Sequence, residues 1–324
     1  GWLLGAVFFF FFAAGMGQIA SAFPTAGGLY LWSSILGGKG WGWATAWFNV
    51  LGLIFVVSSV NVGLWALFRD LILVNIFGMD VSGFGFWQQT IFVLVVTASQ
   101  ALFNHLGIRL TTRLTDFSGY LIFAVAILLT LALLAFAPSF DIGRLFTFKN
   151  YTGAPGGDVF PAMNSLVLAF LSGLILVCYT ITGFDASAHT SEETHNAASS
   201  VPKGMLNAVL YSAIFGFLMI SAFVIAMPSV DEGAAQGWGV FGWLMAGSRM
   251  PEFLKDLLYV GIVIANYLCA LAGLTSTSRM LYAFARDGGL PTALRDVHPE
   301  HKTPVNAIWI GALFAFLATL YAPA

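Results

Sequence analysis

Charged residues are scarce in this chain of 324 residues. Only 9% of the residues are Asp, Glu, Lys or Arg, whereas a soluble domain carries roughly 25%. A chain so poor in charge lacks the polar side chains that cover a water-facing surface, which excludes an ordinary soluble domain. Hydrophobic residues make up 59% of the chain, with 31 Phe and 35 Gly, and this usage is typical of helices that pack within lipid. The composition predicts an integral membrane protein whose outer surface faces the bilayer.

Basic residues, cysteines and histidines are also few. The net charge of -2 argues against nucleic acid as a partner, because phosphate binding needs a dense basic face. The two cysteines, Cys178 and Cys269, lie in apolar runs and offer no disulfide framework. His298 and His301 lie in a polar loop with no third ligand nearby in the sequence, so we expect a solvated loop and no metal site. We expect no cofactor and no catalytic residues.

Eight apolar runs are long enough to cross a bilayer, which takes about 20 residues per helix. They cover residues 1–22, 41–68, 86–103, 117–137, 161–181, 204–227, 257–283 and 303–322. Alternate links define two sides, with eight Lys and Arg on one and five on the other. The richer side is expected in the cytoplasm, so run 1–22 ends inside. Because the chain opens without Met and ends directly after an apolar run, we expect a piece of a longer protein.

The run 161–181 does not end like an ordinary membrane helix. It continues as Thr182-Gly183-Phe184-Asp185, and Thr and Gly hold a helix poorly. A charge at this depth is costly unless it faces a cavity or a partner. A helix broken near Gly183 would expose carbonyls of its first half, which attract an ammonium group, and amides of its second half, which attract an anion. The alternative is a continuous helix that reaches the interface with Asp185 solvated.

Two charged segments suggest a gate on the cytoplasmic side. Glu192 and Glu193 follow the broken run, and Arg279 and Arg286 lie one heptad apart at the end of run 257–283. Pairing of these carboxylates with the arginines would close that side of the protein. The alternative is an interfacial helix start, because Thr190 and Glu193 have the spacing of a capping box.

Polar side chains within the apolar runs have two open interpretations. Four consecutive hydroxyl residues, Thr275 to Ser278, indicate either helix packing or a cation-binding wall. Several further side chains either face a pocket or serve packing: Asn49, Ser58, Ser59, Asn61, Asn266 and Ser276.

Three segments resemble a known family. The segment Ser21 to Tyr30 resembles the link after the second helix of amino acid permeases. Thr182 to Glu193 resembles the broken sixth helix and its continuation in the amino acid–polyamine–organocation (APC) superfamily. Ser278 to Pro291, with Thr303 to Asn306, resembles the link between the eighth and ninth helices. The chain is most similar to the amino acid/choline transporter branch, which includes γ-aminobutyrate and choline permeases.

The resemblance implies an all-α polytopic helix bundle with two inverted five-helix halves. It makes 1–324 a single transmembrane transporter domain that covers about helices two to nine of twelve, so that the first helix and the last three are missing. The implied activity is secondary active transport of amino acids or related amines by alternating access, with no enzymatic chemistry. Alternatives are a choline or polyamine permease or an amino acid exchanger of the same fold, and, from another class, a channel or a non-transporting helix bundle.

The resemblance also implies where the substrate binds. Backbone carbonyls of Tyr179 and Thr182 would hold the substrate's amino group, and the Tyr179 ring would cover it. The implied site is Tyr179, Thr180, Thr182, Gly183, Phe184 and Asp185. Gln18 stands where many relatives have Glu, and Ile122 lies near a position where some relatives have Lys or His, which leaves the coupling ion open between H⁺ and Na⁺. The expected setting is the lipid bilayer of the plasma membrane, with the oligomeric state open.

Overall fold

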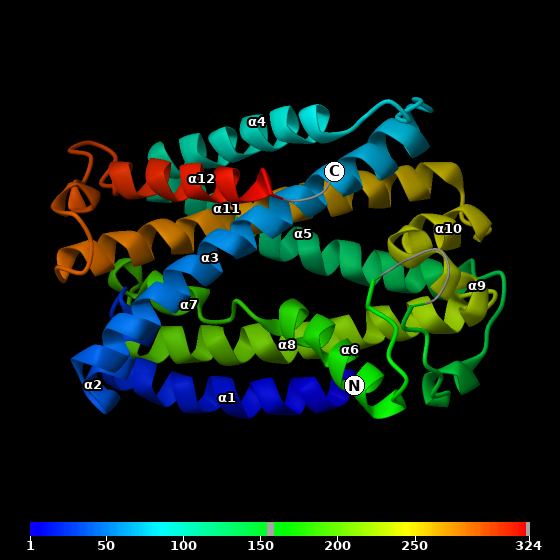
Figure 1. Cartoon of the computed structure of the whole chain (residues 1–324), viewed down its shortest axis with the longest axis horizontal. Coiled ribbons are helices and arrows are strands. Elements are labelled where there is room, and N and C mark those ends of the chain that lie inside the picture. The colour runs from blue at the N-terminus through cyan, green and yellow to red at the C-terminus, as the bar shows by residue number, and fades with distance from the viewer. Residues whose placement is uncertain (154–158, 322–324) are drawn as a thin grey trace. The chain divides into compact units, whose positions relative to one another are not determined.

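A computed structural model describes residues 1–153 and 159–321, and these residues form helices and loops without a strand (Figure 1). The predicted all-α membrane fold is confirmed. Seven segments are long and apolar enough to cross a membrane: Trp2–Ala22, Lys39–Ile76, Phe86–His105, Arg109–Ala135, Leu166–His189, Ala197–Ala226 and Glu252–Arg286. The eighth predicted run contains a shorter apolar helix, Val305–Thr319. Residues 154–158, which lie between the predicted runs 117–137 and 161–181, and residue 322 of the last run lie outside the described residues.

The helices follow one another along the chain, with the longer links before α6 and before α12. The α-helices are α1 (Trp2–Ala22), α2 (Gly28–Gly37), α3 (Lys39–Leu67), α4 (Phe86–His105), α5 (Ile108–Ala135), α6 (Leu166–Ile181), α7 (Ala186–His189), α8 (Ala197–Ala226), α9 (Val230–Ala235), α10 (Val240–Gly247), α11 (Glu252–Arg286) and α12 (Val305–Thr319). A π-helix, η1 (Phe68–Ile76), continues α3. The 3₁₀ turns are η2 (Ile142–Phe146), η3 (Ser191–Glu193), η4 (Gly237–Gly239) and η5 (Thr292–Arg295).

Several helices begin before the apolar runs that predicted them. Helix α5 begins at Ile108, ahead of run 117–137, and its first turns carry Arg109 and Arg113. Helix α8 begins at Ala197, ahead of run 204–227. Hydropathy detects only the apolar part of a helix, which lies in the lipid. The helical hydrogen bonds of the backbone continue beyond it into segments with polar side chains.

The chain divides into two compact units. The first contains residues 1–13, 123–184 and 206–260, and the second contains residues 14–122, 185–205 and 261–324. The first unit therefore holds α6, α9 and α10, whereas the second holds α2, α3, α4, α7 and α12. Helices α1, α5, α8 and α11 contribute residues to both units.

In the second unit, α3 and α4 pack beside α12 (Figure 1). Buried polar side chains join these helices to one another. The amides of Asn61 and Gln100 donate to each other, with N···O distances of 3.0 and 2.9 Å. Ser58 donates to the carbonyl oxygen of Ala315 at 2.7 Å, and Thr275 donates to Asn104 at 2.7 Å. Such bonds hold helices together where lipid removes the hydrophobic drive for association. Ser58, Asn61 and Thr275 therefore link neighbouring helices.

Candidate functional site

The expected helix break is present. Helix α6 ends at Ile181, and the amide of Thr182 makes the last helical hydrogen bond, to the carbonyl of Cys178 at 2.9 Å. Thr182 is extended, and Gly183 has a φ of 91°, which residues with a Cβ adopt at a cost. The chain turns helical again only at Ala186. The alternative of a continuous helix is wrong, because Gly183 turns the backbone out of it.

The residues around the break differ in exposure. Tyr179 is 50% exposed, Thr182 and Gly183 are exposed, and the Thr180 hydroxyl donates to the carbonyl four residues earlier. Phe184 is buried. Its ring meets the rings of Phe9 and Phe12 on α1 edge-on, at centroid distances of 6.2 and 6.3 Å. The Phe184 side chain therefore anchors the break by packing, and Tyr179, Thr182 and Gly183 form its open part.

Asp185 has a partner that the sequence analysis did not identify. One carboxylate oxygen lies 3.6 Å from Nε2 of His189, one helical turn further along. The His189 ring is fully buried, and its Nδ1 lies 3.4 Å from the carbonyl oxygen of Ala26. The spacing of four residues was the available signal, because residues at i and i+4 meet on one helix face. The Asp185 side chain is 21% exposed, so it is partly solvated and lies beside a buried imidazole.

The four charged residues that we considered as a gate lie together in two ion pairs. Nη1 of Arg286 lies 2.9 and 3.0 Å from the two carboxylate oxygens of Glu192. Nη2 of Arg279 lies 3.4 Å from Glu193. The two pairs differ in burial, because the Arg279 side chain is 4% exposed and the Arg286 side chain 37%.

The alternative interpretation of this segment, an interfacial helix start, is wrong. Residues Ser191–Glu193 form a 3₁₀ turn without a side-chain cap. The Thr190 hydroxyl donates to the carbonyl of Ser187 at 3.3 Å, and the next helix begins only at Ala197. The Thr190 hydroxyl is thus bonded to a carbonyl of its own segment and does not cap a helix.

The link that follows α1 is tied to the ion pairs. The amide of Ala26 donates to Glu192 at 3.2 Å, and the Tyr30 hydroxyl donates to Asp287 at 2.5 Å. Burial, reinforced by the hydrogen bond to Asp287, raises the pKa of Tyr30. The phenol therefore stays a neutral donor, and it ties α2 to the residue that follows α11.

A cavity of about 260 Å³ lies among these groups in the second unit. It is lined by Ala26, His189, Glu192, Glu193, Arg279, Tyr282, Val297, Lys302 and Pro304. A larger cavity, of about 610 Å³, lies in the first unit and is lined by residues 145, 147–152, 159 and 160 and by parts of α6, α8 and α9. Neither cavity is lined by residues 179–185. The smaller cavity is lined by residues of both ion pairs and by His189, which contacts Asp185.

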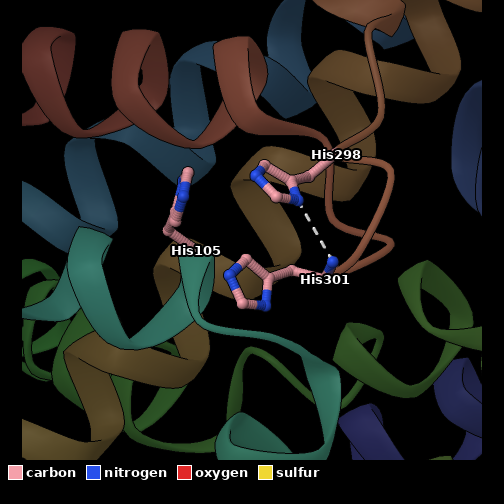
Figure 2. A group of neighbouring side chains, drawn as sticks. All are labelled: His105, His298 and His301. Carbon is pink, nitrogen blue, oxygen red and sulfur yellow. Dashed lines mark hydrogen bonds between the residues drawn. The ribbon is translucent and has the colours of Figure 1, made fainter.

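The expectation that no third ligand lies near His298 and His301 is wrong. His105, the last residue of α4, lies beside both, and nitrogen atoms of the three rings fall within 4.8 Å of one another (Figure 2). His105 precedes His298 by almost two hundred residues, so local spacing carried no signal of this contact.

Comparison with known proteins gives a consistent result. The profile of the family described as amino acid permease matches residues 1–324. The amino-acid permease BAT1 of Arabidopsis thaliana is 32% identical over an alignment that covers 99% of this chain and 64% of the relative. The BAT1 homolog of Oryza sativa subsp. japonica has the same identity and coverage. The branched-chain amino acid permease BcaP of Bacillus subtilis (strain 168) is 26% identical, with 96% and 64% covered.

These relatives are longer than this chain, which spans 64% of the length of each. Because the family profile matches all 324 residues and the apolar helices suit a bilayer, the chain belongs to the amino acid permease family of integral membrane proteins.

Proposed function

We propose that this chain is the larger part of a secondary active transporter that moves amino acids or related amines, such as γ-aminobutyrate, by alternating access. Membership of the amino acid permease family supports the proposal. The names of the relatives, amino-acid permease BAT1 and branched-chain amino acid permease BcaP, point to the same class of substrate. The proposed location is the plasma membrane.

The break after α6 carries the proposal. A helix end leaves its last carbonyls without helical partners, and the helix dipole makes that end partially negative. Helix α6 is 16 residues long, and Thr182 and Gly183 at its end are exposed. The substrate's ammonium group would bind the carbonyls of Tyr179 and Thr182, each of which can accept a second bond through its other lone pair. The Tyr179 ring would cover the substrate, and Asp185 would act through its contact with His189.

The ion pairs Glu192–Arg286 and Glu193–Arg279 would be the cytoplasmic gate. Both pairs join the segment after α7 to the end of α11. Alternating access requires the substrate path to close on one side at a time. Ion pairs between the segment after the break and another helix could close the path on one side. A channel would instead need a continuous polar path. The proposed driving force is a gradient of H⁺ or Na⁺, or the exchange of a second solute.

Two glycines of one membrane segment provide the test. Both have open space where a Cβ would lie, but Gly183 has a φ of 91° and Gly173 lies inside α6. In the complete protein, Gly183→Ala is expected to cost about 1–2 kcal/mol of strain, and Gly173→Ala is expected to be neutral or slightly stabilising. If the turn at Gly183 holds the substrate carbonyls, Gly183→Ala should lower kcat/KM for uptake by about tenfold, which corresponds to 1.4 kcal/mol.

The measurement is uptake of labelled amino acids and γ-aminobutyrate by proteoliposomes at varied pH and Na⁺ concentration. Equal uptake by the two folded variants would show that the helix break at Gly183 has no role in substrate transport. Uptake that does not saturate with substrate concentration would indicate a channel and would overturn the carrier proposal altogether.

A further inference from the structure

Three histidines from distant parts of the chain meet at one place in the second unit. His105 ends α4, whereas His298 and His301 lie in the loop between η5 and α12. The ring centroids are 5.4 Å apart for His105 and His298, 5.7 Å for His105 and His301, and 4.5 Å for His298 and His301. Figure 2 shows the rings of His298 and His301 directed toward His105. All three residues are half-buried, so an ion from solution can reach them.

The backbone around the cluster is fixed by hydrogen bonds. The hydroxyl of the fully buried Thr303 donates to the carbonyl of His105 at 3.1 Å. The amide of His298 donates to the carbonyl of Thr303 at 2.9 Å, and the amide of Lys302 donates to that of His298 at 3.0 Å. The loop is thereby closed on itself and attached to the end of α4. A backbone fixed in this way holds the three histidines near one another and lowers the entropy cost of bringing them together around an ion.

One ring nitrogen of the cluster is unsatisfied. Nδ1 of His105 is buried and has no hydrogen-bond partner in the part of the chain that the structure describes. A buried polar atom without a partner costs free energy, and a bound ligand can remove that cost. The rings of His298 and His301 lie beside this nitrogen, so an ion held between the three rings would give it a partner.

From this geometry we infer that His105, His298 and His301 form a binding site for a divalent transition metal, with Zn²⁺ as the ion that fits best. Neutral imidazole is a ligand for Zn²⁺, Cu²⁺ and Ni²⁺, whereas Ca²⁺ and Mg²⁺ take oxygen ligands. Three histidines and an open fourth position suit tetrahedral Zn²⁺. Bound metal would link the end of α4 to the loop that precedes α12.

His298 must change its hydrogen bonds to take part. Its Nδ1 accepts from the amides of Glu300 and His301, at 3.2 and 3.1 Å, so the neutral ring carries its proton on Nε2. To bind the metal as a neutral imidazole, this ring must turn so that Nδ1 faces the ion, or its proton must move from Nε2 to Nδ1 with loss of the two amide bonds. Glu300 is exposed, so water can replace a lost bond to its amide.

Titration of the purified complete protein with Zn²⁺ alone, in competition with a chromophoric chelator, tests the site. We expect one Zn²⁺ per chain. His105→Gln and His301→Gln should each weaken binding by at least about tenfold, the loss that even an outer-shell partner of a metal site causes. His195→Gln removes an exposed histidine of the same unit that lies outside the cluster, and it should leave binding unchanged. Co²⁺ bound in place of Zn²⁺ should show the visible absorption of a tetrahedral site, and His301→Gln should abolish it.

Zn²⁺ binding that is absent from the folded protein, or equal in the His301→Gln variant, would overturn the inference. His301 lies in a loop, so its variant is informative even if His105→Gln fails to fold. These readouts do not depend on transport, so the inference stands or falls separately from the proposed function.

Discussion

At the scale of single residues, the neighbours Glu192 and Glu193 occupy different surroundings. Glu192 pairs with an arginine that is 37% exposed, and Glu193 pairs with Arg279, which is 4% exposed. Nε and Nη2 of Arg279 have no hydrogen-bond partner among the described residues, so Glu193 provides the main compensation for this buried charge. An exposed ion pair contributes 1 kcal/mol or less, whereas a buried charge that loses its partner is expensive.

Glu193→Gln should therefore destabilise the complete protein by about 2 kcal/mol, because it leaves the Arg279 guanidinium buried without a counter-charge. Glu192→Gln is the matched control and should cost less than about 1 kcal/mol. Thermal unfolding of the two purified variants in detergent measures the difference. Equal midpoints would mean that water reaches Arg279 and that its burial has no energetic consequence.

Residue chemistry made part of this site predictable. The cost of placing Asp185 and four other charges near a membrane identified the residues, and the poor helix propensity of Thr182 and Gly183 identified the break. Which arginine pairs with which glutamate depends on how the end of α11 packs against η3. No local sequence pattern predicts that packing. The same limit hid the contact of His105 with His298, because both come from separate elements.

At the scale of elements, α3 and α4 are joined by the reciprocal amide bonds of Asn61 and Gln100. Both side chains are buried, and each amide nitrogen has a second acceptor, so removal of one amide mainly leaves the carbonyl oxygen of the other without its donor. Asn61→Leu and Gln100→Leu should each destabilise the protein, and the double variant should be less destabilised than the sum. The expected coupling energy is about 1 kcal/mol, in the upper part of the range measured between membrane helices.

A double-mutant cycle on the purified complete protein gives this coupling from the free energies of unfolding of the four variants. Ser59 and Ser99 lie on the same two helices, and the pair of variants Ser59→Ala and Ser99→Ala provides a control cycle with an expected coupling near zero. A coupling near zero for Asn61 and Gln100 as well would show that the two amides find other partners when separated.

Element ends were less predictable than element cores. The apolar runs identified the centres of the membrane helices, because lipid selects hydrophobic side chains there. Helix α2 and the short helices α9 and α10 lie in segments that we treated as links, since their helical backbone is not required by the bilayer. The π-helical continuation of α3 is mostly apolar but contains Arg69 and Asp70, and these two charges ended the predicted run at residue 68.

At the scale of the whole molecule, the distribution of Lys and Arg sets the orientation. The link after α5 belongs to the side with five basic residues, and the start of α8 belongs to the side with eight. Basic residues in short links are retained in the cytoplasm. The segment around Thr147 is therefore expected outside the cell, and the segment around Ser199 inside.

Cysteine labelling of the complete protein in intact cells tests this orientation. Thr147→Cys and Ser199→Cys are small changes at exposed positions, each made in a chain whose native Cys178 and Cys269 are replaced by Ala. A membrane-impermeant maleimide should label the cysteine at position 147 and leave position 199 unlabelled, because only the first faces the medium. Permeabilised cells should show labelling at both positions, which establishes that each cysteine is reactive. The reverse pattern in intact cells would place Glu192, Glu193 and their arginines on the outer side, and the ion pairs would then close the external entrance.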